Sequence, residues 1–225
     1  MIVALLVAAS LADGKVQTFD VGREPRVEIA NLAGDIEVFG EERGDVTVKA
    51  EREGGTEEER ARWTVEVSAA SGEVRVEACC GACGRTRRRC DGSGEVKVRF
   101  ELHVPRGARL DVSTVSGDVA VKGVAGEQRL NSVSGDARVE GSAHDLEVHT
   151  VSGSVELAPG SVGRTAVNSV SGSVRLRLPA GADARVSLST VSGKLDGVRG
   201  GGHVVLGKGT ARIDVETVSG SVSLR

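Results

Sequence analysis

The sequence predicts an all-β fold, a parallel β-solenoid of repeated strand-bend-strand coils with a more irregular β region at its N-terminal end. The tripeptide Val-Ser-Gly recurs six times in the second half of the chain, and such a short repeat is typical of solenoids. Apolar and polar residues also alternate around each copy, which is the period of a strand rather than of a helix. The repeat and the alternation together predict the fold class.

The glycine of each copy is the expected bend. The six glycines are Gly117, Gly135, Gly153, Gly172, Gly193 and Gly220, separated by 18, 18, 19, 21 and 27 residues. Glycine is expected there because a Cβ atom would obstruct a tight bend.

The alternation also predicts which side chains face the core. Leu146 and Val148 stand seven and five residues before Gly153, while Val155 and Leu157 stand two and four residues after it. Each inward Val or Leu contributes about 1.5 to 3 kcal/mol, but a single coil has too few of them to offset its own ordering entropy. We therefore expect the coils to be stable only as a stack.

Residues 1–12 (MIVALLVAASLA) resemble a secretory signal peptide, with cleavage after Ala12. The small residues Ser10 and Ala12 occupy the two positions before the cleavage site that a signal peptidase recognises. The alternative is that the segment is a buried first strand. At about a dozen residues it is too short to span a bilayer, so the mature chain is expected to have no membrane span.

Residues 13–225 are expected to form one β-repeat domain, with degenerate copies in 13–104 and regular copies in 105–225. The same alternation of apolar residues on both sides of a glycine occurs around Gly34, in VEIANLAGDIEV, and again around Gly72. Between them, Val46 and Val48 predict a strand, and the charged residues 51–62 predict a solvated loop or a short helical turn.

All four cysteines lie in the segment 79–94, which we expect to be the tip of a hairpin. They are Cys79, Cys80, Cys83 and Cys90. An even number of cysteines in an exported protein favours structural disulfides, with three possible pairings. The alternatives are a metal site, because Cys80 and Cys83 have a ligand-like spacing, and redox chemistry, because the neighbouring arginines would lower thiol pKa values. With disulfides preferred, we expect no metal and no cofactor.

Three columns of polar residues are candidate sites. In the first, Asp118 and Asp136 follow their glycines and would lie about 4.8 Å apart on adjacent coils, where they could share a proton or Ca²⁺. The alternative is that Gly-Asp is a favoured turn dipeptide, and no third carboxylate is evident in that column.

The second column, four residues before the glycines, is polar throughout. It consists of Ser113, Asn131, His149, Asn168, Ser189 and Glu216. One alternative is catalysis by His149 with a serine nucleophile, although serine recurs here as part of the repeat.

The third column, three residues before the glycines, consists of Thr114, Ser132, Thr150, Ser169, Thr190 and Thr217. Outward hydroxyls would suit ice binding, but the strand parity turns this column inward. We expect a local bend at the following valine, with the hydroxyls capping backbone groups at the corner.

The wording FELHVPRGARLDVSTVSGDVAV, with LRLPAGADARVSLSTVSGKL further on, resembles the bacterial "putative adhesin" family of unknown function with β-strand repeats. The resemblance covers about residues 27–225. It implies an exported, envelope-associated β-solenoid and supplies no catalytic residues.

The sequence therefore predicts an exported, non-enzymatic structural or adhesin-like module that binds an envelope polymer or a protein, in the periplasm, at the cell surface or outside the cell. A net charge of −3 with 2% aromatic residues argues against nucleic acid as a partner. The alternatives are a carbohydrate-active enzyme and a scaffold that polymerises end to end. Self-association is expected at the C-terminal edge, formed by the strands around Gly220.

Overall fold

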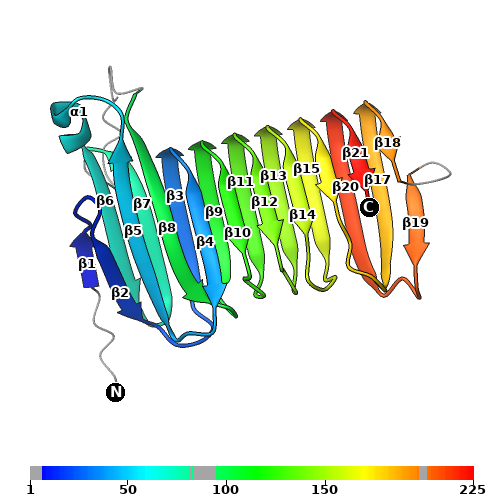
Figure 1. Cartoon of the computed structure of the whole chain (residues 1–225), viewed down its shortest axis with the longest axis horizontal. Coiled ribbons are helices and arrows are strands. Elements are labelled where there is room, and N and C mark those ends of the chain that lie inside the picture. Colours follow the sequence, from blue (N-terminus) through cyan, green and yellow to red (C-terminus); the bar gives the residue numbers. More distant parts are fainter. Residues whose placement is uncertain (1–6, 82, 84–94, 198–201) are drawn as a thin grey trace.

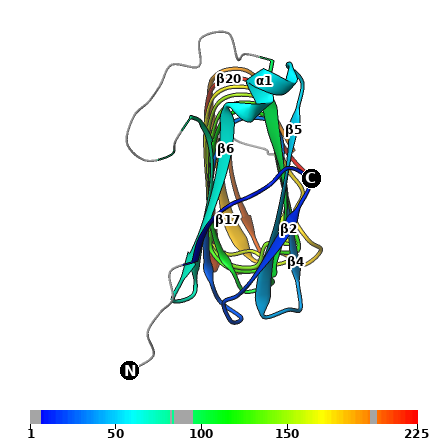
Figure 2. The ribbon, with the colours of Figure 1, turned by 90° about the vertical axis from the view of Figure 1, so that its left-hand side faces the viewer.

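The computed structural model describes residues 7–81, 83, 95–197 and 202–225, and it shows an elongated stack of strands (Figure 1). Viewed along the stack, two sheets face each other across the core (Figure 2). Helix is limited, within the described residues, to α1 (Glu57–Ala61). The predicted all-β class is confirmed.

The first sheet has eleven strands in the order β1 (Val7–Ser10), β6 (Trp63–Ala70), β7 (Glu73–Cys80), β3 (Arg26–Ala33), β9 (Arg109–Ser116), β11 (Gln128–Ser134), β13 (Leu146–Ser152), β15 (Thr165–Ser171), β20 (Ala211–Ser219), β17 (Ala184–Ser192) and β19 (His203–Leu206). The second sheet has ten strands in the order β18 (Leu195–Asp196), β21 (Val222–Leu224), β16 (Val174–Leu176), β14 (Val155–Ala158), β12 (Ala137–Glu140), β10 (Val119–Lys122), β4 (Ile36–Glu41), β8 (Lys97–Pro105), β5 (Asp45–Glu53) and β2 (Val16–Asp20).

Each regular coil has a long strand in the first sheet and a short strand in the second, with the Ser-Gly bend between them. Equivalent strands pair in parallel and in register, so that Ala137 lies between Val119 and Val155. Gly34 occupies the same place between β3 and β4. Residues at equivalent positions of the repeat therefore form columns that run along the stack.

The sheets are mixed, so the predicted parallel β-solenoid is confirmed only in part. The pairs β1/β6, β6/β7, β2/β5, β5/β8 and β17/β19 are antiparallel. At Gly72 the chain makes a hairpin within the first sheet, because Ser71 (φ 48°) and Gly72 (φ 82°) both have positive φ, as in a type I′ turn. Such a turn returns the chain to the same sheet, whereas a coil bend sends it to the other.

The cysteine segment does not connect two strands of a hairpin. The preceding strand β7 lies in the first sheet and the following strand β8 lies in the second. Each strand already has two other partners, since β7 pairs with β6 and β3 and β8 pairs with β5 and β4, so the two strands do not pair with each other. Most of the predicted tip, including Cys90, lies outside the described residues.

The order of the coils in space differs from their order in the chain. The strands of the Gly220 copy, β20 and β21, lie between those of the Gly172 and Gly193 copies. The expectation that the Gly220 strands form the edge is therefore wrong. Val222 and Leu224 continue both inward columns of the second sheet, whereas Gly197 interrupts them in the Gly193 copy, so the more apolar strand occupies the inner place.

The N-terminal segment lies against the irregular end of the stack. β1 pairs with β6, and Leu11 is buried, with its amide donating to the carbonyl of Val65 at 2.9 Å. The charged segment after β5 forms the helix α1, which begins with a capping box between Thr56 and Glu59.

Candidate functional site: a groove along the first sheet

The valines of the repeat point outward and form a continuous apolar column. Its seven members, in stack order, are Leu32, Val115, Val133, Val151, Val170, Val218 and Val191, and each is exposed. Of the nine large hydrophobic residues exposed in the described part of the chain, seven belong to this valine column. The expected local bend is absent because β9, β11, β13 and their equivalents keep strict alternation through the valine.

The polar column identified in the sequence lies beside the valine column on the same outer face. It runs in the order Ser113, Asn131, His149, Asn168, Glu216 and Ser189. Nε2 of His149 lies 2.8 Å from Oε1 of Glu147, and Nδ1 lies 3.4 Å from Nδ2 of Asn168. The ring nitrogens therefore face a carboxylate and an amide, and neither contact involves a serine hydroxyl.

Aligning the repeats does not reveal Glu147 as a partner of His149, because the two residues belong to different columns of the repeat. On a strand, residues two apart share a face, so the spacing alone makes Glu147 available as a partner. Hydrogen bonds from His149 and then from Arg129 hold the pKa of Glu147 below its ordinary value.

A groove of about 910 Å³ lies along these two columns. The intervening Thr and Ser residues also line it, although their side chains turn inward, so its floor is their backbone. The lining extends from Ala30 of β3 to Val191 of β17, so the groove crosses seven coils. Its length and regularity make it the candidate site.

The inward Thr and Ser column cannot order water on the surface, because its described members are buried or half-buried. The hydroxyl of Thr190 donates to the carbonyl of Gly220 at 3.1 Å, and that of Thr150 lies 3.5 Å from the carbonyl of Ser152. These two cap backbone groups near the bend, as expected. The hydroxyls of Thr114, Ser132, Ser169 and Thr217 have no hydrogen-bond partner among the described residues.

The aspartates after the bend glycines connect successive coils. Oδ1 of Asp118 accepts a hydrogen bond from the amide of Asp136 at 2.8 Å, and Oδ1 of Asp136 accepts one from the amide of Ser154 at 2.8 Å. Asp35 is a third member, since its Oδ1 accepts from the amide of Asp118 at 3.0 Å. Sequence reasoning missed Asp35 because Gly34 is far from Gly117 in the chain. The three carboxylates act as an acceptor ladder.

A family model described as Toastrack DUF4097 matches residues 22–225. The chain belongs to the Toastrack DUF4097 family. The match covers nearly all of the chain, including every strand from β3 onward. No curated protein matches the sequence.

Two solved structures resemble this Toastrack chain along nearly its whole length. A putative cell adhesion protein from Clostridium sporogenes has 10% sequence identity and a TM-score of 0.50, and the alignment covers 98% of each chain. A putative adhesin from Bacteroides fragilis has 11% identity and a TM-score of 0.33, covering 98% of this chain and 97% of the other. At 10% identity, the similarity to the Clostridium sporogenes structure is evidence for the fold alone.

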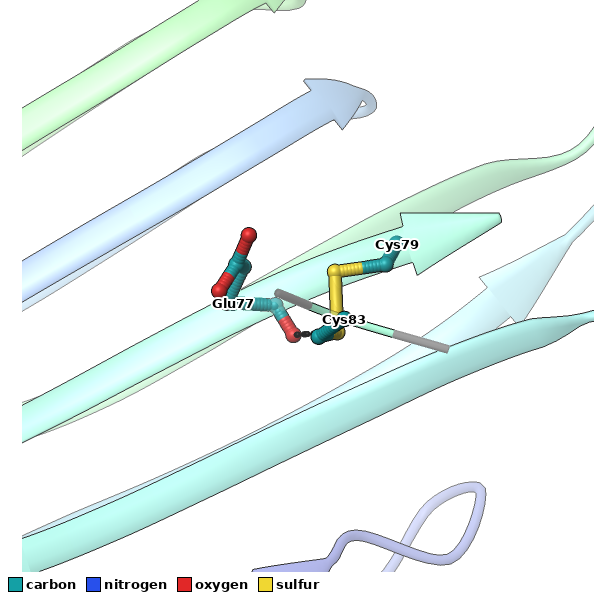
Figure 3. Close-up of a disulfide and its surroundings, with 3 residues drawn as sticks. All are labelled: Glu77, Cys79 and Cys83. Carbon is teal, nitrogen blue, oxygen red and sulfur yellow. Dashed lines mark hydrogen bonds between the residues drawn. A yellow bond between two sulfur atoms is a disulfide. The ribbon is translucent and has the colours of Figure 1, made fainter. Parts of the chain in front are cut away.

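The cysteine segment of the Toastrack chain contains a disulfide between Cys79 and Cys83, with Cα atoms 5.4 Å apart (Figure 3). Cys80 is also disulfide-bonded. Glu77, Cys79 and Cys83 form the one group of potential metal ligands found within the described residues. Because its two sulfurs are bonded to each other, they are not available as thiolate ligands in this state.

A second titratable cluster lies on the outer face of the second sheet. His103 stacks on Phe39 with ring centroids 5.2 Å apart, and Nζ of Lys122 lies 5.7 Å from the Phe39 centroid. Nδ1 of His103 lies 2.7 Å from Oε1 of Glu41, and Nε2 lies 3.3 Å from Oε1 of Glu101. The hydrogen bond to Glu41, followed by that to Glu101, raises the pKa of His103, although partial burial opposes the shift.

The remaining histidines lie apart from these clusters. His144 lines a separate hollow of about 440 Å³, and His203 begins the strand β19. No helix in the described part of the chain is long and apolar enough to cross a membrane.

Proposed function

We propose that this Toastrack protein is an exported, non-enzymatic, adhesin-like module of the cell envelope that binds a surface polymer or a protein through the groove. The observation that carries the proposal is the exposed valine column. Contiguous exposed apolar surface is uncommon on soluble proteins and marks interaction sites. Here such a residue is repeated on seven successive coils of the first sheet.

The lining of the groove supports binding rather than catalysis. Glu216 is its one carboxylate among the described lining residues. Cleavage of glycosides normally uses a pair of carboxylates flanking the scissile bond. The alternative of a carbohydrate-active enzyme therefore lacks the second carboxylate of such a pair among the described lining residues.

The disulfides support export, because such bonds persist in oxidising compartments. Export by the predicted signal peptide would remove β1 and the buried Leu11 and leave Asp13 as the first residue. N-terminal sequencing of the protein recovered from envelope and culture fractions tests this. Recovery only from the cytoplasm, with residues 1–12 retained, would contradict export and support the alternative of a structural first strand.

Binding is tested with the purified mature chain and isolated envelope material. Val151→Asp places a charge in the middle of the valine column, where the residue is 48% exposed and lies outside the buried core. Val205→Asp is the matched control, since Val205 is 57% exposed on β19 of the same sheet and does not line the groove. We expect co-sedimentation with envelope material to be lost in the first variant and kept in the second. Equal co-sedimentation of both variants would remove the groove from the proposal.

A further inference from the structure

The groove is itself a repeating site. Each of the seven coils contributes one apolar side chain, and each except the β3 coil, which has Ala30 at that position, contributes one residue of the polar column in the same register. Successive strands are about 4.8 Å apart. The seven coils give a site about 29 Å long, which is six strand spacings. A ligand that lies along the groove and repeats its own chemistry can form the same contacts at each step.

The two walls of the groove differ in chemistry. One wall is formed by the methyl groups of the valine column, and the other includes the amides of Asn131 and Asn168 and the hydroxyls of Ser113 and Ser189. A matching ligand therefore presents an apolar face on one side and hydroxyl or amide groups along its edge. Sugar rings have this character, since their C–H faces are apolar and their rims carry hydroxyls.

An extended peptide matches the groove less well. The floor strands are paired on both sides, as β13 is with β11 and β15, so their backbone groups are already used. Peptides that add to sheets do so at free edges, where backbone groups remain unpaired. A peptide crossing the strands here would leave most of its own backbone groups unpaired.

The charge of the groove selects among polymers. His149 and Glu216 are the titratable residues among those lining it, and the lining has neither Lys nor Arg. The nearest cation on the adjacent outer column is Arg129, whose guanidinium lies 2.9 Å from Glu147. An anionic polymer would therefore meet Glu216 with no unpaired cation from the lining to compensate.

We propose that the groove binds a neutral linear polysaccharide that lies across the coils, with its apolar ring faces on the valine column and its hydroxyl or amide groups on the polar column. This inference rests on the proposed function and names the class of ligand. Each coil is a weak subsite, so affinity depends on how many coils one chain engages.

The test is a titration of the mature protein with neutral oligosaccharides of increasing length, from disaccharide to octasaccharide, in the chitin, cellulose, mannan and maltose series. Linked weak contacts add through effective concentration. We expect at least one series to show a dissociation constant that falls about tenfold or more between disaccharide and hexasaccharide, and then levels off once the ligand fills the groove. Polygalacturonate of equal length serves as the anionic comparison and should bind more weakly.

Two variants assign the binding to the groove. Val151→Asp and Asn168→Ala should each weaken binding of the longest oligosaccharide about tenfold, whereas Val205→Asp should leave it unchanged. Circular dichroism and thermal melting verify that all three variants are folded.

The outcomes separate this inference from the proposed function. If Val151→Asp abolishes envelope co-sedimentation but no neutral series binds, the glycan inference is wrong and the adhesin-like function stands. Affinity independent of length, or tighter binding of polygalacturonate, would also overturn the inference. Shortened oligosaccharides recovered after incubation would instead contradict the non-enzymatic function.

Discussion

At the scale of single residues, the bend glycines have no substitute because the coils touch there through their backbones. A Cβ atom on Gly153 would lie 2.1 Å from the carbonyl oxygen of Gly135, and the residue has a φ of +129°. The same approach recurs at Gly172, where the distance to the carbonyl oxygen of Gly153 is 2.0 Å. Neighbouring main chains cannot move aside without breaking the stack, so both steric contact and φ require glycine.

Gly153→Val should therefore destabilise the protein by several kcal/mol, because it adds a backbone clash to an unfavourable φ. Urea unfolding followed by circular dichroism measures the change. Gly181→Ala is the control, since Gly181 has a φ of +77° but an added Cβ would meet no atom within 4 Å, so only the conformational cost of about 1 to 2 kcal/mol applies. Equal losses in the two variants would show that close approach of the coils is unimportant.

The contacts of His103 predict a pH dependence of stability. Its pKa is raised above 6.5 in the folded state, so its contribution is complete below the unfolded value and is lost as the pH rises through the folded value. The pKa of Glu41 is lowered from 4.5, chiefly by the hydrogen bond from His103, so its contribution is lost as the pH falls through its folded value. The pair should therefore stabilise the protein most between these two limits.

A double-mutant cycle with His103→Gln and Glu41→Gln isolates the pair from the stacking of His103 on Phe39. We expect a small coupling free energy, since both side chains are partly exposed, which is largest between pH 4.5 and 6.5 and declines as the pH is raised from there into the alkaline range. A coupling that is constant or increases over this range would contradict the assignment of the pair.

At the scale of elements, the aspartate ladder explains why Gly-Asp is used in the first coils. Each carboxylate accepts an amide hydrogen bond from the next coil at the bend, where strand pairing is interrupted. The ladder ends at Ser154, because this residue, which follows Gly153, has no carboxylate. The carboxylates thus stabilise the join between coils, and no described metal-ligand cluster includes them.

Asp118→Ala should destabilise the protein by about 1 kcal/mol, because the amide of Asp136 loses its acceptor. Asp118→Asn keeps a carbonyl oxygen at the same place and should cost less than the alanine variant. Chemical denaturation of the three proteins at neutral pH measures both changes. If the asparagine variant is as unstable as the alanine variant, charge rather than hydrogen bonding accounts for the effect.

The parts of the fold that sequence predicts are those set by local pattern. Alternation correctly places Val148 and Val155 in the core, because successive side chains of a strand point to opposite faces whichever strands pair with it. The hairpin at Gly72 has the same alternation of apolar residues as a coil, and what distinguishes it is the backbone conformation of Ser71 and Gly72, with φ of 48° and 82°. The groove is half predictable: its polar column follows from the repeat, but Val151 and its equivalents lie on the surface instead of in the expected bend.

At the scale of the whole molecule, the order of coils depends on competition between strands that are distant in sequence. Both the Gly193 and Gly220 copies could follow the Gly172 copy, and each has a long strand able to pair with β15. The second sheet decides the order, since β21 offers Val222 and Leu224 to β16, whereas β18 has only two residues. A pattern within one copy contains no information on that competition.

The two ends of the stack differ from its middle, because antiparallel strands lie there beside the parallel coils. At one end antiparallel strands β1, β2, β5 and β6 flank the parallel coils, and at the other the antiparallel strand β19 covers the first sheet. Exposed edges invite pairing with other chains, and short or antiparallel terminal strands limit that pairing. The remaining edge at the Gly193 end is β18, so any self-association at this end would involve β18 or β19 rather than the C-terminal strand.

Amide hydrogen exchange tests this order directly. β20 and β21 are paired on both sides, and Val215 and Val222 are fully buried, so their amides should exchange as slowly as those of β13 and β15 although they are near the C-terminus. β18 and β19, which precede them in the chain, have a partner on one side only and should exchange faster. Mass spectrometry of peptides spanning 202–208 and 211–225 can resolve β19 from β20 and β21. Faster exchange in β20 than in β19 would mean that the coils stack in the order of the sequence, with the Gly220 copy at the edge, and the self-association surface would then return to the C-terminal strands.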